Sequence, residues 1–126
     1  MDNNRDNDIQ YSLIVLDEAN KDIEDLIGFY NDCAGPDSAA RFQGAAETLL
    51  SALTFWPKSH QIWENEENVR RINFPKHKVS IVYRIDDNYY EVIAVAAFHT
   101  LADPDKVKKL VDDRTKHVQN WRNENE

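Results

Sequence analysis

The chain has 126 residues, 41% hydrophobic and 30% charged, a balance typical of one globular domain and not of a disordered chain. Its net charge of −8 argues against broad, non-specific nucleic-acid binding, because the long-range field repels phosphates. A single cysteine excludes an intrachain disulfide, and no apolar run suits a signal peptide or a membrane span, so we expect a soluble, cytoplasmic protein.

The first part of the chain predicts a polar tail, a strand and a helix. Residues 1–10 are polar and are expected to be disordered. Residues 11–16 (YSLIVL) form a short apolar run that is rich in β-formers and predicts a strand. Asp17 then suits the N-cap of a helix, and apolar side chains recur after it at helical spacing.

A second helix is predicted directly after the first. Gly35 suits the end of the first helix and Pro36 the start of the next. The apolar stripe of the second helix continues to about Phe55, and Pro57 stops it. Because the link between the helices is so short, they are expected to pack as an antiparallel hairpin.

The remaining chain predicts three strands and a last helix. After a polar connection at 58–68, strand patterns cover residues 69–74, 79–85 and 89–98, with a turn at 86–88. Residues 92–98 are all apolar, which predicts a central strand covered on both faces. Asp103 and Pro104 suit the start of a final helix that docks on the body, and 123–126 is expected to be a tail.

These elements predict an α+β fold in a single domain at residues 11–122. Its order is strand, helix hairpin, three-strand antiparallel meander and C-terminal helix, arranged in two layers.

A cationic segment stands out within this acidic chain. Residues 69–84 contain five basic residues and no acid, so the rest of the chain carries a net charge of −13. Such a segment suggests a surface that meets a phosphate backbone or an acidic partner segment. The five residues are Arg70, Arg71, Lys76, Lys78 and Arg84. Because Arg70 and Arg71 point to opposite faces of a strand, one of them is expected to form a structural salt bridge.

Several short motifs in the same order resemble the RelE/ParE superfamily of type II toxin–antitoxin toxins, and the ParE side more closely. The stretches are PDSAARFQGAAETLLSALTFWP, VRRINFP, VSIVYRIDD and VIAVAAFHTLADP. The positions that match the family pattern are Pro36, Ala40, Arg41, Phe42, Pro57, Arg70, Tyr83, Arg84, His99, Asp103 and Pro104. The resemblance implies a small toxin of the plasmid-stabilisation type, neutralised by a cognate antitoxin that wraps over it. ParE-like members act on DNA gyrase, whereas RelE-like members cut mRNA on the ribosome.

The sequence departs from both branches of that family. RNA-cutting relatives often have an arginine where Ser80 stands and a tyrosine where Thr100 stands. ParE-like members often carry arginines directly after the histidine, where this chain has Leu101 and Ala102. Tyr83 shares the strand face of Val79 and Ile81, which predicts a core or semi-buried position.

Three functional hypotheses follow. The leading one is a ParE-like toxin that inhibits growth by binding a target such as DNA gyrase. Antitoxin and target would then contact Arg70, Arg71, Lys76, Lys78 and Arg84. The second is a ribosome-dependent mRNA endoribonuclease with His99 and Arg84 as catalytic residues, although a lone histidine at a strand end is more often structural. The third is a non-toxic binding module.

The expected partner is an antitoxin with an acidic or amphipathic segment, and a homodimer is compatible with the sequence. Glu64, Glu66 and Glu67 have no histidine or cysteine at ligand spacing, so no metal site is predicted. The three glycines form no phosphate-binding loop, and no cofactor is expected.

Overall fold

The computed structural model describes residues 9–124, so the predicted tail at 1–10 lies almost wholly outside the described residues, as do residues 125 and 126. In chain order the elements are β1 (Ser12–Val15), α2 (Asp17–Ala34), α3 (Pro36–Ala52), β2 (Gln61–Trp63), β3 (Glu66–Phe74), β4 (Val79–Asp86), β5 (Glu91–His99) and α4 (Pro104–Glu124). Helix α4 therefore continues two residues into the segment predicted as a C-terminal tail.

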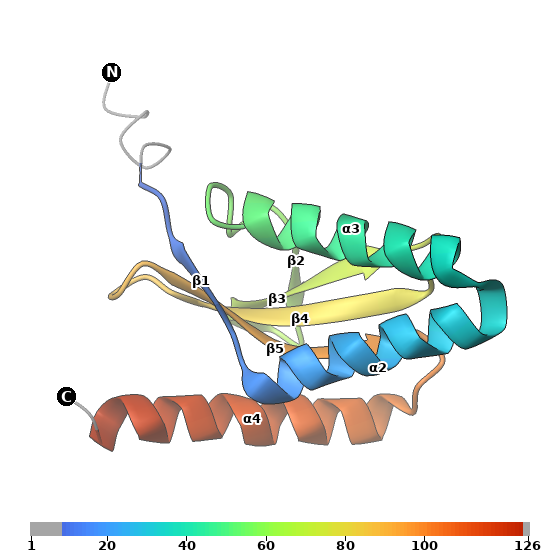
Figure 1. The fold of residues 1–126 in the computed structure, drawn as a ribbon. Coiled ribbons are helices and arrows are strands. Elements are labelled where there is room, and N and C mark those ends of the chain that lie inside the picture. The colour runs from blue at the N-terminus through green and yellow to red at the C-terminus, as the bar shows by residue number, and fades with distance from the viewer. Residues whose placement is uncertain (1–8, 125–126) are drawn as a thin grey trace.

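The strands form one open sheet in the order β1-β5-β4-β3-β2, and this confirms the predicted α+β class (Figure 1). The meander β3-β4-β5 is antiparallel throughout, as predicted. Strand β1 pairs in parallel with β5, so the first strand of the chain lies beside the last one. Strand β5 is thereby central and almost entirely buried, in agreement with its continuous apolar sequence.

The sequence-based prediction of a polar connection at 58–68 was wrong. Strand β2 lies there as a sheet edge, paired antiparallel with β3. The turn between them places Glu64 and Asn65 at φ of 47° and 65°, the left-handed conformation of tight hairpin turns. Only three residues form β2, and two of them are exposed, so their sequence carries no clear period-two pattern.

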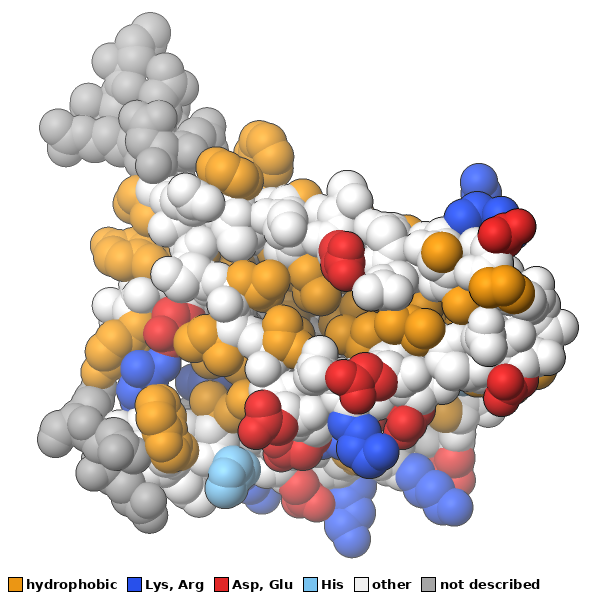
Figure 2. All heavy atoms as spheres, in the orientation of Figure 1, with side chains coloured by type: hydrophobic (Ala, Val, Ile, Leu, Met, Phe, Trp, Pro, Cys, Tyr) orange, Lys and Arg blue, Asp and Glu red, His pale blue; other side chains and the backbone are white. Residues whose placement is uncertain are grey.

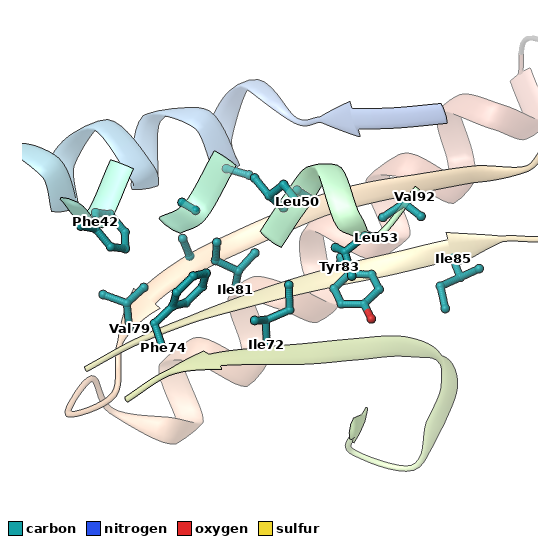
Figure 3. Packing of buried hydrophobic residues seen from close by; sticks show 14 residues of the cluster. Phe42, Leu50, Leu53, Ile72, Phe74, Val79, Ile81, Tyr83, Ile85 and Val92 are labelled. Carbon is teal, nitrogen blue, oxygen red and sulfur yellow. The ribbon is translucent and has the colours of Figure 1, made fainter. Parts of the chain in front are cut away.

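Helices cover both faces of the sheet (Figure 1). The α2–α3 hairpin packs on one face, where Phe42, Leu50 and Leu53 meet apolar residues of β3, β4 and β5 (Figure 3). Helix α4 packs on the other face through Val107 and Val111. Helix α4 docks on the sheet as expected, but the hairpin, the sheet and α4 form three layers, one more than the two that the sequence predicted.

The helix ends agree only in part with the predicted signals. Gly35 has φ of 88° between α2 and α3, a conformation that favours glycine, and Asp103 accepts a hydrogen bond from Asp105 N at the start of α4. Asp17, by contrast, is not the N-cap of α2. It is the first helical residue, and Leu16 holds the cap position without a side-chain hydrogen bond.

A β-bulge in β5 positions the residues that follow it. Val82 of β4 pairs with Ala96 and Tyr83 pairs with Ala94, so Val95 is an extra residue in β5. Beyond the bulge the alternation of faces is reversed. His99 therefore lies on the hairpin face of the sheet, next to Val79, its pairing partner in β4.

Candidate functional site

The five cations of the predicted basic surface are distributed over both faces of the sheet and one turn. Arg70 and Arg71 lie on opposite faces of β3, as their adjacency predicts. Arg71 and Arg84 lie on the α4 face, and Lys76 and Lys78 lie in the β3–β4 turn.

Arg70 supports the chain between α3 and β2. Its guanidinium donates hydrogen bonds to the carbonyl oxygens of Lys58, His60 and Glu67, at 3.0 to 3.2 Å. The sequence predicted a salt bridge for one of the two arginines, but within residues 9–124 neither Arg70 nor Arg71 is ion-paired. Arg70 thus satisfies backbone groups where the chain has few regular backbone partners.

Arg71 is held by neutral groups. Its Nη2 donates to the hydroxyl of the fully buried Ser80 at 2.9 Å, and its Nε donates to Asn73 Oδ1 at 2.9 Å. The guanidinium also lies over the rings of Trp63 and Phe98, at 5.6 and 5.4 Å from the ring centroids. The hydroxyl of Ser80 and the two aromatic rings therefore help to fix Arg71 in place.

Arg84 and the two turn lysines keep their charges available. Arg84 is half-buried on β4 and has no ion-pair partner among residues 9–124. Lys76 and Lys78 are exposed, and Lys78 O accepts a hydrogen bond from Thr100 N at 2.8 Å. The β3–β4 turn therefore lies beside the connection from β5 to α4.

His99 makes contacts that fit a structural role. Its Nδ1 accepts a hydrogen bond from Leu101 N at 3.1 Å, and its ring stands edge-to-face with Phe29 of α2 at 6.2 Å between centroids. A cleft of about 480 Å³ lies beside the ring. Residues of α2, among them Asp22 and Asp25, and of β5 line it.

Tyr83 is a core residue, as its strand period predicts. It is fully buried, and its hydroxyl donates a 2.6 Å hydrogen bond to Pro57 O (Figure 3). Burial raises the pKa of Tyr83 well above its usual range, and the nearby Arg70 charge offsets only part of that rise. A buried phenol with such a pKa does not donate its proton readily at neutral pH.

The structure does not bring His99 and Arg84 together. His99 lies on the hairpin face and pairs with Val79, whereas Arg84 shares the α4 face with Val82. Val79 and Arg84 are five positions apart on β4, which corresponds to about 17 Å along a strand. The two side chains therefore do not converge on one reacting group.

No group of three or more histidine, cysteine or acidic side chains suited to a metal ion is found within residues 9–124. Across the same residues, no helix has the length and apolar character needed to cross a bilayer.

Two features of the molecule could not be recognised from the sequence. One is the ion pair between Asp22 and Arg114, which no spacing rule could reveal because 92 residues separate them. The other is a cluster of exposed aromatic rings around Trp56, because Phe55 and Trp56 resembled the last turn of a helix.

One family model matches most of the chain. The model of the family described as "ParE toxin of type II toxin-antitoxin system, parDE" matches residues 13–100. No match is found among curated protein sequences.

Three solved structures share the fold at low sequence identity. A mutant of the toxin RelE from E. coli in the free state has 13% identity and a TM-score of 0.59, covering 86% of this chain and 98% of RelE. The chromosomal ParDE system from P. aeruginosa has 16% sequence identity and a TM-score of 0.59, and the match covers 71% of this chain and 96% of that chain. The toxin–antitoxin complex RelBE2 from Mycobacterium tuberculosis has 16% sequence identity and a TM-score of 0.52, and the match covers 72% of this chain and 99% of that chain.

Proposed function

Because this chain belongs to the ParE toxin family of type II toxin–antitoxin systems, we propose that it arrests growth by binding a macromolecular target and not by cutting RNA. The proposed target is DNA gyrase. The neutralising partner is a cognate antitoxin, and two of the similar structures belong to toxin–antitoxin systems.

The placement of His99 and Arg84 on opposite faces of the sheet carries this proposal. Cutting RNA through its 2′-hydroxyl requires a proton carrier and a cation at the same phosphate. The candidate proton carrier faces α2, and the candidate cation faces α4. The hydroxyl of Tyr83, the residue before Arg84, cannot serve as the proton carrier instead, because it is buried and donates a hydrogen bond to a backbone carbonyl.

The cations that remain exposed support a binding role. Lys76 and Lys78 lie beside the β5–α4 connection, and α4 begins nearby with Lys106, Lys108 and Lys109. These five lysines outnumber the two acids of the same stretch, Asp103 and Asp105, so this end of the sheet carries more positive than negative side chains. An acidic segment of the antitoxin would be attracted to it.

The decisive experiment compares two activities of the purified chain. We expect it to inhibit gyrase supercoiling and to leave mRNA on ribosomes intact. The opposite pattern, with mRNA cleaved and supercoiling unaffected, would support the ribonuclease hypothesis instead. Absence of growth arrest on induction without the antitoxin would favour a non-toxic binding module.

Two variants sharpen the comparison. His99→Ala and Arg84→Ala are each expected to keep part or all of the growth arrest, because neither acts as a catalyst. If each variant abolished growth arrest while circular dichroism showed an intact fold, the proposal would fail and His99 and Arg84 would be assigned as catalytic residues.

A further inference from the structure

An exposed aromatic surface lies at the opposite end of the sheet from the cationic turn. The aromatic patch comprises Tyr11, Phe55, Trp56 and Tyr90, which line a hollow of about 600 Å³. Trp56 is 60% exposed, and Phe55 and Tyr90 are each about half exposed. Figure 2 shows hydrophobic side chains gathered around the start of β1 and the connection after α3.

The two charged side chains in this hollow are already paired within the chain. Asp87 accepts a hydrogen bond from the Tyr11 hydroxyl at 2.7 Å and forms an ion pair with Lys58 at 3.3 Å. The Tyr11 hydrogen bond, with the Lys58 ion pair in a lesser role, lowers the pKa of Asp87. A partner would therefore find apolar rings and no unpaired charge on the lining of the hollow.

We propose that the aromatic patch is the contact surface between two copies of this chain. A chain with a net charge of −8 repels its own copies over most of its surface. The hairpin illustrates this, since residues 17–52 contain eight acidic and only two basic side chains. The one lysine and one aspartate that line the patch neutralise each other, so two copies can approach there without that repulsion.

The chemistry of the patch also favours a second copy over a charged partner. An acidic antitoxin segment would gain no charge-assisted contacts at a neutral surface, whereas the turn around Lys76 and Lys78 offers them. A two-fold interface brings the same patch together from both copies, and neutral aromatic surfaces are complementary to themselves. Tyrosine, tryptophan and phenylalanine are enriched in such interfaces.

The expected dimer is weak. Half-exposed aromatic side chains contribute roughly 100 Å² each, so the rings supply a few hundred Å² per copy. This area is smaller than that of a standard specific interface, so the dimer is expected to be a weak, transient one. The purified chain should therefore change from monomer to dimer over an accessible concentration range.

The test is sedimentation equilibrium of the full chain, made by cell-free synthesis, alongside two variants. Trp56→Ser removes the most exposed ring of the patch, and Leu101→Ser removes a side chain that is 82% exposed in the β5–α4 connection. We expect the full chain to dimerise, Trp56→Ser to raise the Kd about tenfold or more, and Leu101→Ser to leave it unchanged. Added salt should maintain or strengthen the dimer, because it screens the repulsion between copies.

Each other outcome overturns the proposal. A chain that stays monomeric at all concentrations would mean that something other than a second copy covers the patch. A dimer that Trp56→Ser leaves intact, or one that Leu101→Ser weakens equally, would place the interface elsewhere. Matching circular dichroism of the variants shows that any loss of the dimer is not a loss of folding. None of these results depends on whether gyrase is the target.

Discussion

Asp22 of α2 and Arg114 of α4 form an ion pair, 2.7 Å between Oδ2 and Nη1, at the edge of β5 that β1 leaves open. Asp22 Oδ2 accepts a hydrogen bond from Ala97 N at 3.1 Å, and Arg114 Nη1 donates to Val95 O at 2.9 Å. These backbone groups belong to the bulge residue Val95 and to Ala97 just after it, beyond the last residue that pairs with β1. One ion pair thus satisfies the free edge of the central strand and connects the hairpin to α4.

Replacing Arg114 should therefore be costly. Arg114→Met leaves the Asp22 carboxylate without its counter-ion and Val95 O without a partner. The loss is costly because both side chains of the pair are only about one-fifth exposed or less. We expect the free energy of unfolding to fall by about 2–4 kcal/mol, measured by urea denaturation.

The pair between Lys21 and Asp25 provides the matched control. Its nitrogen–oxygen distance is 3.5 Å, and the side chains are 75% and 67% exposed. Asp25→Asn should cost less than about 0.5 kcal/mol. Similar losses for Asp25→Asn and Arg114→Met would show that burial of the Asp22–Arg114 pair has no special importance.

Replacement by alanine should change the stability in opposite directions at Gly28, within helix α2, and at Gly35, directly after it. Gly28 lies exposed within α2, and a Cβ there would meet no atom within 4 Å, so Gly28→Ala should add about 0.5–1 kcal/mol of stability. Gly35 has φ of 88°, so Gly35→Ala should cost about 1 kcal/mol or more. Thermal melting of the two variants checks both signs, and a stabilising Gly35→Ala would contradict the role assigned to its backbone.

Sequence periodicity sufficed for the long elements and failed where a single residue changes the register. Residues 92–98 are all apolar, which correctly predicted a central strand, but the same uniformity conceals the bulge at Val95. Unless the position of the bulge is known, the sheet face on which His99 lies cannot be deduced from the sequence.

The candidate site was predictable in its parts but not in its connections. Alternation correctly placed Arg70 and Arg71 on opposite faces, because that rule is local. Their partners are backbone carbonyls from the chain before β3 and the buried Ser80 of the next strand, which only the fold brings near. Short β2 was missed for a related reason, since its stability comes from pairing with β3 and not from its own sequence.

Charge reversal at the β3–β4 turn should weaken the proposed antitoxin complex. Lys76 and Lys78 are exposed, so each contact that they make with an acidic segment is worth about 0.2–1 kcal/mol. Replacing both with glutamate should raise the Kd roughly 2- to 30-fold, as measured by titration calorimetry, and should reduce the weakening that salt causes. Lys21→Glu, on the acidic helix α2, is the control and should leave the Kd nearly unchanged. An affinity insensitive to salt in the unmodified chain would contradict this electrostatic picture.

The hydroxyl of Tyr83 should determine part of the stability at alkaline pH. Its pKa in the folded protein lies above the ordinary value of 10.0, because burial disfavours the phenolate. Below pH 10 the tyrosine is protonated in both states and its contribution to stability is complete. As pH rises above 10, the unfolded chain loses this proton first, and the contribution falls progressively until pH reaches the folded pKa.

Tyr83→Phe separates the hydrogen bond from this titration. At neutral pH the variant leaves Pro57 O without its buried donor, so it should unfold with about 1–2 kcal/mol less free energy. Above pH 10 the difference should shrink by up to about 1.4 kcal/mol per pH unit, because the phenylalanine has no proton to lose. Tyr89→Phe, at an exposed ring, is the control and should leave the curve nearly unchanged. Parallel pH profiles for Tyr83→Phe and the unmodified chain would mean that Tyr83 titrates alike in the folded and unfolded states.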